Sequence, residues 1–265
     1  MKPIIYLLIA AVGFTFLTSF SSKISDKSPQ LTAGEHLRVI PVKDSKAFPG
    51  ATLKIRDIQT IEMTAPDSVL FKVTYNVANF TLTECTEDPN THQMANSQEG
   101  QHINFIMDNL PYIPLYKPEH EMKLKKGTEH YLMSFLSRSY HESIKENDGF
   151  VLNHFKITQD GKYQELAMPK TPMLFYSRPK GEYAGKDTQA VLLDFYLLNT
   201  QLSEKGNRVK VEINGKSFML NHWQPYKIEG LPLGENKIKL TLIDASGHPL
   251  KGENTSVERT IILKE

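Results

Sequence analysis

Alternation of apolar and polar residues at a period of two is the feature that most limits what this chain can fold into. Apolar residues take every second position in the segments RVKVEI (208–213) and KIKLTL (237–242). Such alternation buries one face of a β-strand and leaves the other face exposed to solvent. Asn214-Gly215 follows the first of these segments, and this dipeptide favours a two-residue hairpin because both positions need positive φ. The pattern therefore predicts antiparallel β-structure.

Three stretches of the chain recur in the same order further along. Residues 101–115 lie over 207–221, 127–143 over 234–250, and 67–82 over 187–202. This order indicates a duplicated unit of about 100 residues. We therefore predict an all-β chain with two tandem antiparallel sandwiches of immunoglobulin or fibronectin-III type, related by internal duplication and preceded by a signal peptide.

The N-terminal segment is typical of a signal peptide. Lys2 precedes an uncharged apolar run, Ile4–Leu17, which is followed by small residues. The run is short for a membrane span, although an uncleaved anchor remains the alternative. Phe20 stands where a lipoprotein signal has its lipidated cysteine. We expect an exported protein, periplasmic or extracellular, that is not lipidated and has no stable membrane anchor after cleavage.

These patterns set the expected domain limits. They are a signal peptide (1–21), a leader (22–34), a first sandwich with a long loop at 83–100 (35–164), a linker (165–172) and a second sandwich (173–265). The segment 36–42 is expected to be an extra strand of the first sandwich, without a counterpart in the second. Because the linker is short and holds two prolines, we expect the two sandwiches to touch.

Charge and cysteine content exclude several classes of protein. Lysine and arginine total 31 against 30 aspartates and glutamates, so a strongly basic nucleic-acid binder is excluded as the default. The single cysteine, Cys85, excludes an internal disulfide framework and CxxC sites. The sequence has no GxSxG, HExxH or P-loop motif, so we expect neither an enzyme nor a bound cofactor.

The places where the two copies differ are where function is best sought. The first copy has the long polar loop 83–100, where the second crosses through 203–206. In an immunoglobulin-like sandwich this loop and the hairpin 138–149 lie at the same end. The predicted binding constellation there is His102, Arg138, Ser139, Tyr140, His141 and Glu142.

Plainer readings of the same residues stay open. The loop 83–100 is alternatively a tolerated surface insertion, and Arg138 and Glu142 alternatively form a local ion pair. The alternation also places His102 with Asn104, Ile106 and Asp108 on the outer, wet face of their strand.

The chain resembles a family of bacterial exported proteins commonly labelled phosphopeptide-binding proteins. The matching stretches are GQHINFIMDN (100–109), FLSRSYHESIK (135–145), LFYSRPKGEYAGKDTQAVLLDFYLLN (174–199) and GLPLGENKIKLTLID (230–244). Members often carry a lipoprotein signal, from which this chain departs at Phe20. It also has Asn104 where relatives have a second histidine. The resemblance implies recognition of a phosphorylated peptide.

Phosphate is held best by arginine clusters, so the basic residues near the expected domain contact become candidates. Arg138 lies in the first copy, and Arg178 and Lys180 lie at the start of the second. We expect these groups to converge if the sandwiches pack closely. A peptide or protein ligand is the predicted partner.

Two other functions remain as alternatives. His102, His141 and Glu142 could supply nitrogen and oxygen ligands to zinc or copper if they converge, with His92 as a further candidate. The chain could instead be a structural or adhesion module of the cell envelope, using the faces and edges of its sandwiches.

Overall fold

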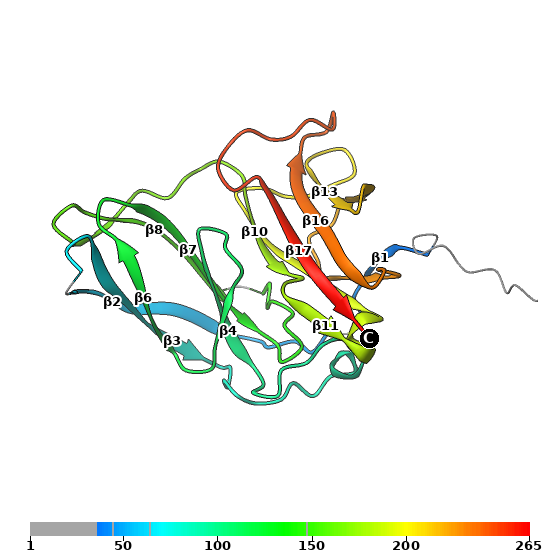
Figure 1. Cartoon of the computed structure of the whole chain (residues 1–265), viewed down its shortest axis with the longest axis horizontal. Helices are drawn as coiled ribbons and strands as arrows, with labels where there is room; N and C mark the ends of the chain where they lie inside the picture. The colour runs from blue at the N-terminus through cyan, green and yellow to red at the C-terminus, as the bar shows by residue number, and fades with distance from the viewer. Residues whose placement is uncertain (1–35, 44, 64, 147) are drawn as a thin grey trace, which may run out of the picture. The chain divides into compact units, whose positions relative to one another are not determined.

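The computed structural model describes residues 36–265 apart from 44, 64 and 147. Two short 3₁₀ turns occur, η1 (Pro89–His92) and η2 (Gly185–Thr188), and every other regular element is a β-strand (Figure 1). This confirms the predicted all-β class. Within the described range, no helix is long and apolar enough to cross a bilayer. The expected signal peptide and leader, residues 1–34, lie outside the described residues.

The first copy of the repeat is built from two antiparallel sheets. Its strands are β2 (Thr52–Glu62), β3 (Ser68–Ala78), β4 (His102–Met107), β5 (Ile113–Leu115), β6 (Glu119–Lys125), β7 (Glu129–Ser137), β8 (Phe150–Ile157) and β9 (Tyr163–Glu165). One sheet has the order β2-β3-β6 and the other β5-β4-β7-β8-β9. Apolar side chains from both sheets form one core, which includes Leu53, Phe71, Phe105, Leu132 and Phe155.

The second copy repeats this arrangement except at one edge strand. Its strands are β10 (Met173–Arg178), β11 (Glu182–Ala184), β12 (Val191–Leu198), β13 (Arg208–Ile213), β14 (Lys216–Leu220), β15 (Tyr226–Glu229), β16 (Gly234–Ile243) and β17 (Ser256–Lys264). The series β14-β13-β16-β17 matches β5-β4-β7-β8, and the series β10-β12-β15 matches β2-β3-β6. The edge strands differ, because β9 follows β8 and is antiparallel to it, whereas β11 follows β10 and is parallel to β17. The otherwise equal strand orders agree with the predicted duplication.

Strand β1 (Arg38–Pro41) corrects the expectation for the segment 36–42. The segment is extended as predicted, but it pairs with β15 of the second copy and not with a strand of the first. It thereby becomes the edge of the sheet β1-β15-β12-β10. The period-two pattern identifies such a strand but carries no information about which sheet receives it.

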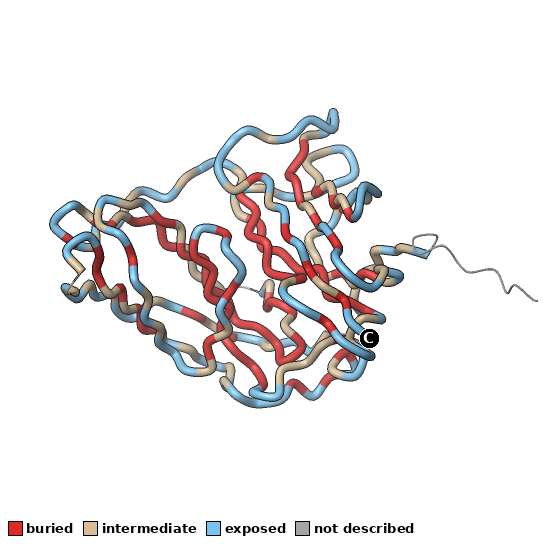
Figure 2. Tube along the Cα trace, viewed as in Figure 1, coloured by how far each residue is buried: buried red, intermediate tan, exposed pale blue. Residues whose placement is uncertain are grey.

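The outer face of β4 is buried, which corrects the prediction that it is wet. His102, Asn104 and Ile106 are all fully buried, and Figure 2 shows the neighbouring strands buried as well. The cause is the second copy, which covers this face. Ile106, Met133 and Phe135 of the first copy pack with Phe175 and Tyr196 of the second in one apolar cluster. The predicted contact between the sandwiches is therefore present.

The hairpin between β4 and β5 fastens the two copies together. Asn109 lies in the left-handed region with φ 58°, matching the position of Gly215 in the second copy. Its Nδ2 donates to the Leu174 carbonyl at 2.7 Å, and its Oδ1 accepts from the Tyr176 backbone N–H at 2.9 Å. Because Asn109 is itself buried, water does not readily replace it as a partner of these two backbone groups.

Exchanging the residues of the two equivalent hairpins tests this fastening. Asn109→Gly keeps the left-handed backbone but removes both side-chain hydrogen bonds, so we expect the free energy of unfolding to fall by about 2–4 kcal/mol. Gly215→Asn is the reciprocal control: nothing lies near the position of its Cβ, so we expect only the cost of the positive φ, about 1 kcal/mol or less for Asn. Urea denaturation measures both. Equal effects would contradict the fastening role.

Candidate ligand-binding site

The predicted loop end exists, and its two segments hold each other. Ser97 N–H donates to the Ser139 carbonyl at 2.9 Å, and the Ser139 N–H donates to Thr86 Oγ1 at 3.0 Å. Tyr140 donates its hydroxyl to Asp88, also at 2.9 Å. Ser139 and Tyr140 are therefore fully buried anchors of the loop 83–100. This corrects their prediction as ligand contacts, because their polar groups are already used.

Arg138 and Glu142 form the local ion pair that was the plainer reading. Arg138 Nη1 lies 3.0 Å from Glu142 Oε1, and both side chains are about 95% buried (5% and 3% exposed). Arg138 Nε also donates to the Lys46 carbonyl at 2.9 Å, and Ser45 donates to Glu142 at 2.8 Å. Burial raises the pKa of Glu142 and Arg138 opposes that rise. Since both charges are paired and enclosed, neither is available to a ligand, which corrects both assignments.

His141 turns the other way and meets His102. The hairpin gives His141 a left-handed backbone with φ 69°. Its Nδ1 lies 3.2 Å from His102 Nε2 and 3.2 Å from the Tyr112 hydroxyl. His102 Nδ1 lies 2.8 Å from the Gly100 carbonyl, which can only accept, so that nitrogen carries a hydrogen. In the neutral ring His102 Nε2 then accepts from His141 Nδ1.

Cations of the second copy lie beside this histidine pair. Lys180 Nζ donates to the Tyr112 carbonyl at 2.6 Å and lies 3.9 Å from the centre of the Tyr112 ring. The Arg178 guanidinium lies 5.2 Å from the same ring centre and donates to the Tyr183 hydroxyl at 2.9 Å. The expected convergence across the domain contact therefore holds for Arg178 and Lys180 with His102 and His141, but not for Arg138.

Arg259 is a third cation at this place, and the sequence reasoning missed it. Its guanidinium donates to the carbonyls of Ser177 at 3.0 Å and Leu110 at 3.1 Å, and it lies 4.4 Å from the centre of the Tyr176 ring. A signal was present in the sequence. Arg259 occupies an apolar position in the alternation of β17, between Val257 and Ile261. A charge on the inward face of a strand usually has a specific partner.

We call Arg178, Lys180 and Arg259 the cation cluster. Arg178 and Arg259 are each only 8% exposed, whereas Lys180 is partly exposed. Among the described residues, no carboxylate lies within ion-pair distance of any of the three. The ion pairs that do occur involve other residues. The cationic groups contact backbone carbonyl oxygens and tyrosine rings instead.

Burial, with the charges of the cluster, lowers the pKa values of Lys180, His102 and His141. Burial, followed by the charges of Arg178 and Arg259, lowers the pKa of Lys180 to about 8. Burial is also the first cause for His102, whose pKa falls to about 4, with Arg178 and Lys180 adding to the shift. The pKa of His141 is lowered well below its ordinary value for the same reasons. Both histidines are therefore neutral at pH 7, and Lys180 is mostly charged.

The three candidate metal ligands do not converge. His102 and His141 are in contact, but Glu142 is paired with Arg138 on the other side of the hairpin. In the part of the chain that the structure describes, no group of three histidine, cysteine, aspartate or glutamate residues could hold a metal ion. His92, the further candidate, is exposed on η1.

Comparison with known proteins gives only distant structural likeness. No family model and no curated protein matches the chain. Among solved structures, the fibronectin(III)-like modules of Clostridium thermocellum CbhA match over 80% of this chain and 94% of theirs, at 11% identity and a TM-score of 0.28. The two tandem V-type regions of the chitin-binding protein VCBP3 match over 81% and 100%, at 10% identity and a TM-score of 0.22.

The two neutral histidines predict a specific loss of stability in acid. A histidine whose folded pKa lies below its unfolded value of about 6.5 binds a proton more readily in the unfolded chain, so stability falls as the pH drops through that value. Each such group costs about 1.4 kcal/mol per pH unit until its folded pKa is reached. His141→Asn keeps a residue that tolerates positive φ but does not titrate.

We therefore expect His141→Asn to lose about 1–2 kcal/mol less stability than the wild type between pH 7 and pH 5. Denaturant midpoints across this range measure the difference. An unchanged slope for His141→Asn would show that His141 is not held neutral.

Proposed function

We propose that this chain is an exported, non-catalytic binding protein that holds an anionic group, of the phosphate monoester class, at the cation cluster. One observation carries the proposal: three cations gather at the contact of the two sandwiches with no carboxylate beside them among the described residues. Buried cations without an acidic partner are costly, and an anion supplied by a ligand would compensate them.

Lys180 is the group we assign to direct contact with the ligand. Its ammonium has three donors, and the structure shows one of them used, on the Tyr112 carbonyl. It is also the most accessible of the three cations. Arg178 and Arg259 lie deeper and donate to groups of the protein, so their part is to raise the positive potential around Lys180.

Phosphate fits this site better than a carboxylate does. A phosphate monoester carries about −1.5 to −2 charges at pH 7, against −1 for a carboxylate, so it gains more from three neighbouring cations. The likeness to proteins labelled phosphopeptide-binding supports the same ligand class. The non-catalytic reading is supported by Ser139, whose buried Oγ accepts a hydrogen bond from the Thr86 backbone at 3.1 Å and does not face the cluster.

A structural module of the cell envelope is the second candidate. It is favoured by the firm contact between the two sandwiches, where Lys145 of the first copy forms an ion pair with the fully buried Asp194 of the second. Such a contact holds the two copies in one arrangement, as a spacer requires. A spacer would bind neither phosphate nor phosphopeptide.

Replacement of Lys180 separates these functions. We expect the wild type to bind a phosphoserine peptide more tightly than its unphosphorylated twin, and Lys180→Met to weaken phosphopeptide binding by about 10- to 100-fold, the value of one charge-assisted hydrogen bond. Isothermal titration calorimetry measures both, with inorganic phosphate as a competitor. Lys186→Met, on the exposed turn η2, is the matched control and should bind as the wild type does. Equal affinity for both peptides would overturn the proposal.

The lowered pKa of Lys180 makes a second prediction about the same site. The binding form is the ammonium, so the competent fraction falls as the pH rises through about 8. We expect phosphopeptide affinity to fall by nearly tenfold per pH unit above pH 8.5, whereas an ordinary exposed lysine would keep its charge to about pH 10. Titrations at pH 7, 8, 9 and 9.5 measure the profile. A flat profile to pH 9.5 would exclude Lys180 as the contact group.

A further inference from the structure

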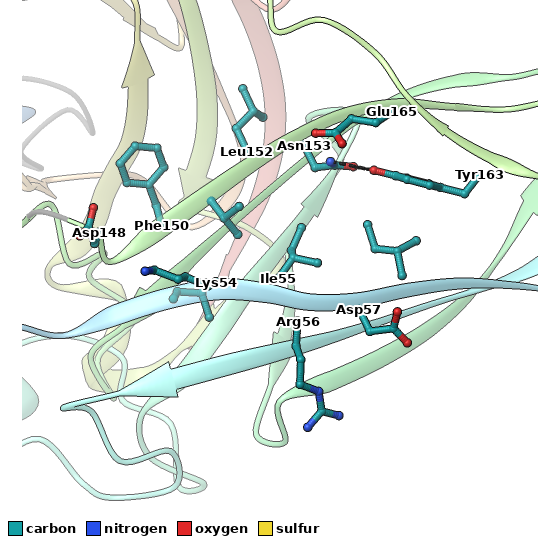
Figure 3. A pocket seen from close by; sticks show the side chains of 13 residues that line it. Lys54, Ile55, Arg56, Asp57, Asp148, Phe150, Leu152, Asn153, Tyr163 and Glu165 are labelled. Atoms are coloured by element: carbon teal, nitrogen blue, oxygen red, sulfur yellow. Dashed lines mark hydrogen bonds between the residues drawn. The ribbon is translucent and has the colours of Figure 1, made fainter.

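A groove opens along one side of the first sandwich, away from the cation cluster. It has a volume of about 580 Å³ and lies between strand β2 on one wall and strands β8 and β9 on the other (Figure 3). Its lining includes the apolar residues Leu53, Ile55, Ile58 and Val151, whereas the side chains of Phe150 and Leu152 pack toward the second copy. The size lies in the range of ligand-binding clefts.

The β8 wall of this groove is an unpaired strand edge. Strand β9 pairs with β8 only at Phe155–Ile157. Beyond β9, one more backbone hydrogen bond runs from the Leu166 N–H to the His154 carbonyl, and the chain then turns away from β8. Among the described residues, no strand pairs with the outer edge of 150–153. Such an edge offers its backbone groups to another strand.

Alternation along β8 shows which backbone groups are free. Ile157 N–H donates to the Thr128 carbonyl, and the Gly149 carbonyl accepts from Leu136, so odd-numbered residues bond toward β7. The backbone N–H and C=O groups of the even-numbered residues therefore point away from β7 and toward the groove, as the His154 carbonyl does. Within the described part of the chain, no hydrogen bond reaches the backbone N–H and C=O groups of Phe150 and Leu152.

The second copy shows why this side is open in the first. At the position equivalent to Asn153, the second copy has Arg259, whose long side chain crosses to the Ser177 carbonyl on β10. Asn153 is shorter and reaches only Tyr163, at 3.0 Å, within its own sheet. In both copies a short strand pairs with the last strand on this side, β9 at Phe155–Ile157 of β8 and β11 at Ile262–Lys264 of β17. The fold therefore accepts an added strand along this side.

The charges on the two walls indicate the chemistry of the occupant. Lys54, Arg56 and Asp57 are exposed on the β2 wall, and Asp148 and Glu165 are exposed at the two ends of the free β8 edge. No ion pair joins these opposite charges across the groove. An extended segment with apolar side chains facing inward and charges of both signs along its borders complements this lining.

We propose that the groove binds an extended peptide segment as an added strand on the free edge of β8, continuing the line of β9. Backbone hydrogen bonds to Phe150 and Leu152 hold the segment, and alternate apolar side chains fill the space between β2 and β8. This site is separate from the cation cluster and does not depend on the function proposed for it.

Replacement of Leu152 by proline tests this pairing. Leu152→Pro removes the groove-facing N–H while leaving the bonds toward β7, as proline does on edge strands. Leu152→Ala is the matched control, because it trims the side chain but keeps the N–H. The probe is a phage-displayed library of linear peptides in which apolar and random positions alternate. For peptides selected against the wild type, we expect a loss of affinity of at least tenfold with Leu152→Pro and less than about threefold with Leu152→Ala.

Two further readouts keep the proposal decidable. Circular dichroism confirms that each variant folds, and amide hydrogen exchange on the wild type shows whether a selected peptide protects the Leu152 N–H. Phosphopeptide affinity at Lys180 should be unchanged in both variants, which separates this site from the cation cluster. Failure to enrich any peptide, equal affinities of the two variants, or an unprotected Leu152 amide would each overturn the proposal.

Discussion

The burial of a second face of strand β4 is the constraint on which the rest of the structure depends. A strand in a single sandwich keeps one face for water, but here the second copy covers His102, Asn104 and Ile106. Polar groups placed on that face must then find partners inside the protein. Such partners are supplied by the contact between His102 and His141, by the hydrogen bonds of Asn109 and by those of Arg259.

The cation cluster follows from the same burial. Two copies that pack face to face bring the end of β10 against the hairpin of the first copy, and so place Arg178 and Lys180 beside His141. All three cations belong to the second copy, but Tyr112, which Arg178 and Lys180 contact, comes from the first. The residues that distinguish the two copies and form the candidate site thus lie at the contact between the copies and not at a loop tip.

Local patterns predicted local structure well and long-range partnership poorly. The period-two segments and the Asn214-Gly215 turn gave the strands and hairpins, because both depend on neighbours in the chain. The sheet that receives β1 depends on a partner almost 190 residues away, and no local pattern records it. The outer face of β4 was assigned wrongly for a related reason, since alternation cannot show that a second domain covers the wet side.

The candidate site shows the same division. His141, Arg178 and Lys180 were found because the two copies differ there or because the residues are basic, whereas Arg138 and Glu142 had the right chemistry and turned out to pair with each other. Arg259 carried a readable signal, a charge in an apolar position of β17. Its meaning depended on carbonyl groups contributed by other strands, which only the folded chain brings together.

Strand β1 has a mechanical consequence. It precedes the first copy in the chain but pairs only within the second, so a load applied at its N-terminal side enters the molecule through the β1–β15 ladder. The second copy would lose its edge strand before the first copy bears any tension. Cutting the chain between the copies would likewise leave the second one without that edge. The two copies therefore form one joined unit, and they are not independent domains connected only by a linker.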